Sequence, residues 1–297
     1  MSGPGEATVR VFDRRLLRLR RARAAGRDDG VTFLRDEVAD RLAERLDDIR
    51  QAFPVVLDLG CGDGALGRRL APHLGIERLV SADLGSLPHA SPPGLRLVAD
   101  EEMLPFAADS LDAIVSAMAL HWVNDLPGTL AQIRWCLKAD GLFLAAFPGG
   151  DTLHELRGAL LRAELELTGG ASPRVSPFVD LRDAAALLQR AGLALPVADV
   201  DRLTVTYGEP LRLLAELRAM GETSALAPRG RPLARAVLAR AMHLYRRDHG
   251  DSQGRVPATF DILFLAGWKP HASQQAPAPR GSGKVGLASA LPPPKRP

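Results

Sequence analysis

The stretch Phe53-Pro-Val-Val-Leu-Asp-Leu-Gly-Cys-Gly-Asp-Gly-Ala-Leu-Gly67 decides the fold of this 297-residue chain. Its aliphatic run from Val55 to Leu59 is typical of a strand that is buried on both faces. Three glycines follow this strand at alternate positions, and a helix is predicted to begin at Ala65. This order predicts a nucleotide-type binding loop, because glycine permits close backbone approach and the first helical N–H groups face a ligand.

Two carboxylates make this loop unsuited to a dinucleotide. Asp58 lies just before Gly60, and Asp63 follows Gly62. Negative charge at these positions repels a pyrophosphate and attracts an ammonium or sulfonium group. S-adenosyl-L-methionine (SAM) carries both cations and no phosphate, so we expect it to bind at Asp58, Gly60, Cys61 and Gly62. A purely structural glycine turn is the alternative, and Cys61 is interpreted as a small loop residue rather than a reactive thiol.

The composition is that of an ordinary globular protein. Hydrophobic residues make up 46% of the chain and charged residues 25%, which is typical of soluble domains. The net charge of +3 is too small to indicate a nucleic-acid partner. Two cysteines indicate no disulfide framework and favour a reducing compartment. No apolar run is long enough to span a bilayer, so we expect peripheral membrane association at most.

Residues 1–30 are predicted to form a basic N-terminal arm. Arginines are frequent between Arg14 and Arg27, whereas Asp13, Asp28 and Asp29 argue against a mitochondrial transit peptide. We therefore expect a solvated basic helix that docks on the main domain, with a partner-binding arm as the alternative. A bacterial cytoplasm is the expected location, or the mitochondrial matrix if the source is eukaryotic.

The rest of the chain alternates between strand and helix patterns, which predicts an α/β fold with a doubly wound, seven-stranded, mostly parallel sheet. The last two strands can pair as an antiparallel edge. We expect a SAM-binding domain over residues 31–269 and a disordered tail rich in Pro, Ala, Ser and Gly over 270–297. The predicted strands are 55–59, 78–82, 95–98, 111–116, 141–147, 199–207 and 259–267, and the predicted helices are 31–50, 65–74, 125–137, 151–168, 180–191, 211–220 and 231–247.

Acidic residues follow the second and third strands at the end of the sheet where such folds bind ligands. Asp83 comes about 20 residues after the glycine loop, where a βαβ fold places a carboxylate on ribose hydroxyls, and Leu84 lies beside it. Asp100 and Glu101 follow the third strand. We expect an acid there to hold the adenine amino group while Met103 packs on the ring.

Candidate catalytic residues follow the fourth and fifth strands. We expect His121 and Trp122 to face the methyl group of SAM and Asp151 to orient a substrate, although Trp122 also fits a packing role. His121, Asp151 and His154 together have the composition of a two-histidine, one-carboxylate Fe(II) site. The alternative is that these histidines are helix caps or core partners.

Several stretches besides the glycine loop carry a more specific resemblance. They are Val11-Phe-Asp-Arg14, Ala99-Asp-Glu-Glu102, Leu120-His-Trp-Val-Asn-Asp-Leu-Pro127, Gly149-Gly-Asp-Thr-Leu-His-Glu-Leu-Arg157, Ser172-Pro-Arg-Val-Ser-Pro-Phe178, Met220-Gly-Glu222, Val256-Pro-Ala-Thr259 and Gly267-Trp-Lys269. With Leu57-Asp-Leu-Gly-Cys-Gly62, they resemble class I SAM-dependent methyltransferases. More narrowly, they are similar to the family of the mitochondrial complex I assembly factor described as a protein arginine hydroxylase, together with its bacterial relatives.

The resemblance implies a seven-stranded sheet that binds SAM through Asp58, Gly60, Gly62, Asp83 and Asp100. It also implies modification of an arginine in a peripheral-arm subunit of respiratory complex I. Two other hypotheses stay open. The chain more distantly resembles the malonyl-carrier-protein carboxyl methyltransferase of biotin synthesis, and methyl transfer needs little beyond positioning because the sulfonium is already activated. A non-catalytic assembly chaperone with SAM as a structural ligand is the second.

Overall fold

The computed structural model describes residues 10–25, 31–73, 75–85, 94–275 and 281–282. Most of the predicted tail, and the ends of the predicted N-terminal arm, lie outside these residues. The elements in chain order are α1 (Arg14–Ala25), α2 (Phe33–Asp47), β1 (Val55–Leu59), α3 (Ala65–Leu70), β2 (Arg78–Asp83), β3 (Leu95–Val98), β4 (Leu111–Ala117), the 3-10 turn η1 (Leu120–Trp122), α4 (Leu126–Cys136), β5 (Leu137–Gly149), α5 (His154–Thr168), α6 (Leu181–Arg190), β6 (Ala194–Tyr207), α7 (Pro210–Ala219), α8 (Arg235–His249) and β7 (Val256–Trp268).

One seven-stranded sheet has the order β3-β2-β1-β4-β5-β7-β6. β1 pairs in parallel with β2 and with β4, and β4 pairs in parallel with β5. β7 runs antiparallel to both of its neighbours, β5 and β6. The structure therefore confirms the predicted fold, and it places the antiparallel strand β7 next to the edge strand β6.

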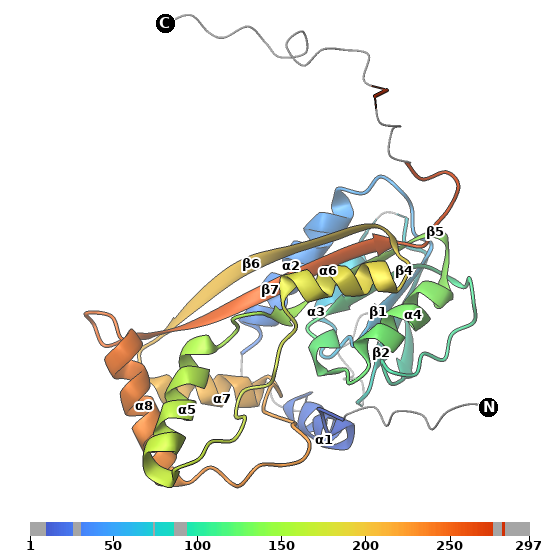
Figure 1. The fold of residues 1–297 in the computed structure, drawn as a ribbon. Helices are drawn as coiled ribbons and strands as arrows, with labels where there is room; N and C mark the ends of the chain where they lie inside the picture. The colour runs from blue at the N-terminus through green and yellow to red at the C-terminus, as the bar shows by residue number, and fades with distance from the viewer. Residues whose placement is uncertain (1–9, 26–30, 74, 86–93, 276–280, 283–297) are drawn as a thin grey trace, which may run out of the picture.

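The core lies on both faces of the sheet because the central strands are apolar at successive positions. In β1, Val56 packs in one buried cluster with residues of α2 and α3, and Leu57 packs in another with residues of α4 and α6. Figure 1 shows α2 and α6 on opposite sides of the sheet. Within the described residues, no helix has the length and apolar character needed to cross a membrane.

β5, β6 and β7 are longer than the sequence patterns predicted. β6 and β7 stay paired from Ala194 with Trp268 to Tyr207 with Val256, and they extend past the other strands to an end where α5, α7 and α8 gather (Figure 1). Pro196 lies in an irregularity of β6, which an edge strand tolerates because a proline there removes no ladder hydrogen bond. Residues at this end of the molecule line the apolar cavity that adjoins the cofactor cavity, and both are described below.

Candidate functional site

The glycine loop between β1 and α3 has the backbone geometry that requires glycine. Gly60, Gly62 and Gly64 have positive φ angles of 72°, 54° and 79°. A Cβ atom on Gly60 would lie 2.1 Å from the Cβ of Ala119, so Gly60 also permits close packing. The backbone N–H groups of Gly60 and Cys61 donate to the carbonyl of Ala82 at 2.7 and 3.0 Å, which ties the loop to β2.

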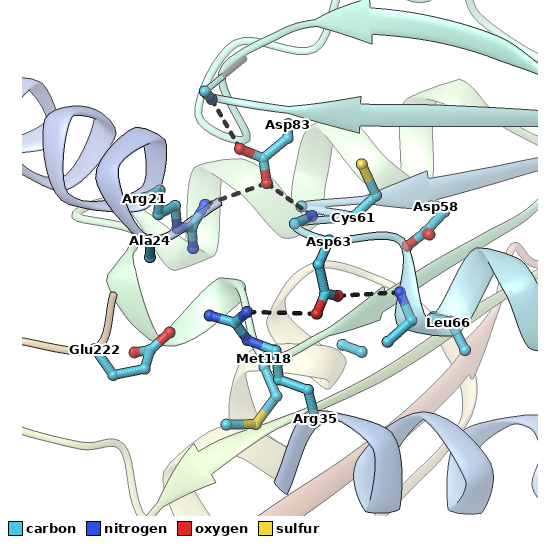
Figure 2. A pocket seen from close by; sticks show the side chains of 15 residues that line it. Arg21, Ala24, Arg35, Asp58, Cys61, Asp63, Leu66, Asp83, Met118 and Glu222 are labelled. Atoms are coloured by element: carbon cyan, nitrogen blue, oxygen red, sulfur yellow. Dashed lines mark hydrogen bonds and ion pairs between the residues drawn. The ribbon is translucent and has the colours of Figure 1, made fainter. Parts of the chain in front are cut away.

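Asp58 is a buried carboxylate that lacks a donor. Neither of its oxygens has a hydrogen-bond partner among the described residues. Burial, with the nearby charge of Asp83, raises the pKa of Asp58 to about 7. A buried polar group without a partner is costly, and Asp58 lines a cavity with Gly60, Gly62 and Asp83 (Figure 2). An ammonium group of a ligand would supply the missing donor, so the loop fits the amino-acid end of SAM.

Asp83 sits on the opposite side of this cavity (Figure 2). It accepts hydrogen bonds from the backbone N–H groups of Gly62 at 3.1 Å and Gly85 at 2.7 Å. Burial keeps the pKa of Cys61, on the same cavity wall, above its ordinary value, so this thiol stays protonated. Five predicted cofactor residues thus line one cavity, namely Asp58, Gly60, Cys61, Gly62 and Asp83.

The other four predicted cofactor residues lie away from that lining. Leu84 packs against the apolar cluster of α1 and Trp122, and the side chain of Met103 is 75% exposed. Asp100 and Glu101 are engaged by α1, because Arg14 forms ion pairs with both carboxylates. A cofactor that entered the site would meet these ion pairs of Arg14 with Asp100 and Glu101.

Helix α1 forms one wall of the cofactor cavity. The guanidinium of Arg21 lies 3.0 Å from the carboxylate of Glu101 and 3.6 Å from that of Asp83, and Ala24 also lines the cavity (Figure 2). Burial lowers the pKa of Arg21, but Asp83 and Glu101 together raise it above its ordinary value, so it stays charged. The helix docks on the domain as predicted, but the side chains of Arg14 and Arg21 are only 13% and 12% exposed rather than solvated.

The cofactor cavity is narrow, at about 50 Å³. Arg21 from α1 and Arg35 from α2 both line it, and Arg35 lies 3.6 Å from the carboxylate of Asp63 (Figure 2). This volume holds only a few water molecules. We therefore expect the two arginine side chains to turn aside when a nucleoside enters.

A second and larger cavity of about 280 Å³ adjoins the first. Its lining is mainly apolar and comes from α5, α7, the 175–178 loop and β7. Met118 and Glu222 line both cavities, so they mark the place where the two meet. Met118 has a φ of +56°, a left-handed conformation that is uncommon for residues other than glycine and tends to occur at functional sites.

Glu222 is the charged group at this junction. It accepts a hydrogen bond from Trp122 Nε1 at 2.8 Å and lies 3.1 Å from His121 Nε2. Burial alone would raise the pKa of Glu222, but the hydrogen bond and charge of His121, with the charges of Arg35 and Arg21, lower it to about 2. Glu222 is therefore an ionised carboxylate at neutral pH.

His121 presents its other ring nitrogen without a partner. Its side chain lines the larger cavity, and Nδ1 is buried with no hydrogen-bond partner among the described residues. Glu222 therefore orients the imidazole from its Nε2 side and leaves Nδ1 open to a group in the larger cavity. An imidazole oriented by a carboxylate is an arrangement used in general acid–base catalysis.

Sequence comparisons agree with this geometry. Residues 57–145 match the family described as "Methyltransferase domain". The chain is 41% identical to the human protein described as "Arginine-hydroxylase NDUFAF5, mitochondrial", over 97% of this chain and 86% of that one. The chain belongs to the family of this arginine hydroxylase. It is an enzyme of the SAM-dependent methyltransferase superfamily, in which SAM is the cofactor.

This member of the NDUFAF5 family also has relatives named as methyltransferases. It is 37% identical to the malonyl-[acyl-carrier protein] O-methyltransferase of Laribacter hongkongensis, over 84% of this chain and 87% of that one. Among solved structures, it is similar to Haemonchus contortus phosphoethanolamine N-methyltransferase 2 in complex with S-adenosyl-L-methionine, with a TM-score of 0.51 and 15% identity. That likeness spans 86% of this chain and 60% of the other, and it shows a shared fold.

The predicted metal trio is not brought together in this family member. His121 faces Glu222, whereas the carboxylate of Asp151 is 67% exposed and 3.7 Å from Arg202. His154 Nδ1 contacts the backbone oxygen of Asp151 at 3.1 Å instead. Within the described residues, no group of three His, Cys, Asp or Glu side chains is arranged to hold a metal ion. The cause is that β5 continues to Gly149 and α5 begins only at His154, which carries both residues toward β7.

Sequence reasoning missed two residues that shape the site. Glu222 was noted within a resembling stretch but was given no role. Arg21 was counted only as part of a basic arm, although its spacing of seven from Arg14 places both side chains on one face of a helix. Because acidic residues were predicted at the strand ends, this spacing could have predicted the ion pairs by which α1 forms one wall of the cofactor cavity.

Proposed function

We propose that this chain is a SAM-binding enzyme that modifies an arginine side chain of a protein, with hydroxylation as the reaction that its family favours. Asp58, Gly60, Gly62 and Asp83 would hold SAM in the narrower cavity. The substrate side chain would enter the larger cavity and reach the junction at Met118 and Glu222. The four SAM-binding residues would hold the cofactor beside the junction, and a bound SAM would supply an activated sulfonium group.

The observation that carries the proposal is the carboxylate of Glu222, which is ionised and only 12% exposed at the junction. A guanidinium in the larger cavity would gain a charge-assisted hydrogen bond from this carboxylate. The free Nδ1 of His121 offers a second acceptor on the same wall. The apolar lining of the cavity suits the aliphatic part of an arginine side chain.

Methyl transfer to a carboxylate is the second candidate. Its support is the 37% identity to a malonyl-[acyl-carrier protein] O-methyltransferase. Glu222 weighs against it at the junction, because a malonyl carboxylate there would meet a like charge, although Arg174 and Arg218 also line this cavity. We therefore rank arginine modification first.

The partner that we propose is a peripheral-arm subunit of respiratory complex I, and the location is a bacterial cytoplasm or, in a eukaryote, the mitochondrial matrix. The resemblance to the complex I assembly factor family supports both. An assembly chaperone that holds the same subunit without altering it is the non-catalytic form of this proposal.

One experiment separates these outcomes. The purified protein is incubated in air with SAM and an arginine-containing peptide of a peripheral-arm subunit, with and without added Fe(II) and ascorbate, and the peptide is then weighed by mass spectrometry. A gain of one oxygen on the arginine supports hydroxylation, and a gain of one methyl group supports arginine methylation. A bound but unaltered peptide supports the chaperone. An unmodified, unbound peptide together with methylation of a malonyl-carrier protein contradicts the proposal.

A further inference from the structure

Three arginines surround a separate hollow on the surface. Arg20 and Arg23 of α1 and Arg218 of α7, with Ala24 and Thr223, line a space of about 340 Å³. Arg218 and Thr223 also line the larger cavity. The arginine hollow and the larger cavity therefore adjoin, and they do so at the molecular surface because Arg218 is exposed.

The positive charges of this hollow are not neutralised by the described part of the chain. No described carboxylate forms an ion pair with Arg23 or Arg218, and Arg20 donates only to the backbone carbonyls of Thr223, at 2.8 Å, and Ser224. Some arginines elsewhere on the surface pair with carboxylates, as in Arg212–Glu216, Arg240–Glu166 and Arg246–Glu209, but the hollow differs in bringing three arginines together.

Like charges are crowded in this hollow. Burial, followed by the charge of Arg229 and that of Arg23, lowers the pKa of Arg20. Asp13 opposes this shift, but its carboxylate is also 3.9 Å from Arg229. A cluster that disfavours its own charges is stabilised when an anion binds among them.

Helix α1 therefore has two arginine faces with different roles. Arg14 and Arg21 point inward and are matched by carboxylates of the cofactor site. Arg20 and Arg23 point to the hollow, where no described carboxylate forms an ion pair with them and only the charge of Asp13 opposes that of Arg20. Arg20 and Arg23 are therefore available to bind an external partner.

We propose that the arginine hollow binds an acidic segment of the protein substrate and holds that protein while its target side chain enters the adjoining cavity. The second half of this statement rests on the proposed function. A concave site with three guanidinium groups suits carboxylate side chains of a peptide, because guanidinium and carboxylate pair in a bidentate geometry. A flat lipid surface would not reach into such a hollow.

The test measures binding of a fluorescein-labelled peptide of ten glutamates by fluorescence anisotropy, at low and at moderate salt. We expect saturable binding to the full-length protein that weakens as salt rises. The double variant Arg23→Glu/Arg218→Glu should weaken binding at least tenfold. The matched control Arg15→Glu/Arg18→Glu reverses two exposed arginines on another face of α1 and should weaken it less than threefold.

Several results would overturn the proposal. Equal losses in the two double variants would show a general charge effect, and no binding of the glutamate peptide at low salt would remove the site. Binding only to vesicles that contain phosphatidylglycerol would assign the hollow to a membrane. Arg23→Gln/Arg218→Gln repeats the comparison without charge reversal, in case the first variant does not fold. The peptide assay involves no turnover, so a failed arginine modification with intact peptide binding refutes the proposed function alone.

Discussion

Asp58 is the single residue whose chemistry most directly predicts a pH effect. Its folded-state pKa of about 7 exceeds the ordinary value of 3.8. Below pH 7 the carboxylate is largely protonated and cannot pair with an ammonium group. We expect the affinity for SAM to rise about eightfold between pH 6.0 and 7.5, as Asp58 loses its proton. Isothermal titration calorimetry checks this, and Asp58→Asn should bind weakly at every pH with no such rise.

The same shift has an opposite effect on the ligand-free fold. Between pH 4 and 7 the folded protein keeps a proton on Asp58 that the unfolded chain has lost, so this residue lowers stability as pH rises through that window. Asp58→Asn should remove that part of the pH dependence in urea unfolding. If wild type and variant show the same pH profiles, the burial of an unpaired carboxylate is contradicted.

Gly60 and Gly62 offer a matched pair of substitutions. Gly60→Ala adds a methyl group 2.1 Å from the Cβ of Ala119 at a φ of +72°, so we expect it to lower the free energy of unfolding by about 3 kcal/mol. Gly62→Ala meets nothing closer than 4.0 Å, and it should lose about 1 kcal/mol but weaken SAM binding, because Gly62 lines the cavity. Urea unfolding and calorimetry measure the two effects. Equal destabilisation by both substitutions would contradict the packing argument.

At the scale of elements, α1 is held to the sheet by charge as well as by apolar packing. Leu17 is fully buried beside Trp122, and Arg21 lies between Asp83 and Glu101. Arg21→Ala would leave a fully buried Glu101 with fewer partners. We expect a loss of about 3 kcal/mol in the free energy of unfolding, measured in urea. Arg18→Ala, an exposed change on the same helix, is the control and should alter stability by less than about 0.5 kcal/mol.

The short strands β1 and β3 could be predicted, whereas the long strands β5, β6 and β7 could not be predicted in full. β1 and β3 were predicted with their observed bounds because short apolar runs end at glycine or acidic residues. β5, β6 and β7 were predicted too short, because they continue through Gly141, Pro196 and Pro257, which are residues that disfavour a strand interior. Partner strands, which a local pattern does not contain, override such residues.

At the scale of the whole molecule, the site joins segments that are remote in sequence. The glycine loop was predictable because its residues are neighbours and their chemistry is local. Glu222 reaches the junction because the segment after α7 contacts His121 and Trp122 of η1, and no spacing in the sequence encodes that contact. His121, Asp151 and His154 do not converge for a related reason. The length of β5 decides where Asp151 and His154 lie, and a local pattern did not predict that length.

The junction between the two cavities yields a prediction at this scale. Glu222→Gln keeps an acceptor for Trp122 Nε1 but removes the charge. We expect modification of the arginine peptide to fall about 10²-fold, because a buried guanidinium loses its ionic partner, while the Kd for SAM changes less than about threefold. Mass-spectrometric rates and calorimetry measure these. Glu155→Gln, which alters a buried glutamate bound to Thr259, is the control for a general loss of stability.

The position of β7 has a consequence for how the protein is made. This strand is the last in the chain, yet it fills the gap between β5 and β6. While the chain is still being synthesised, β5 and β6 each expose a row of unpaired backbone groups, and such edges invite wrong pairings. The end of the sheet that walls the larger cavity can close only after the final strand emerges from the ribosome. A substrate protein therefore meets a competent binding site only after β7 has been synthesised and has paired with β5 and β6.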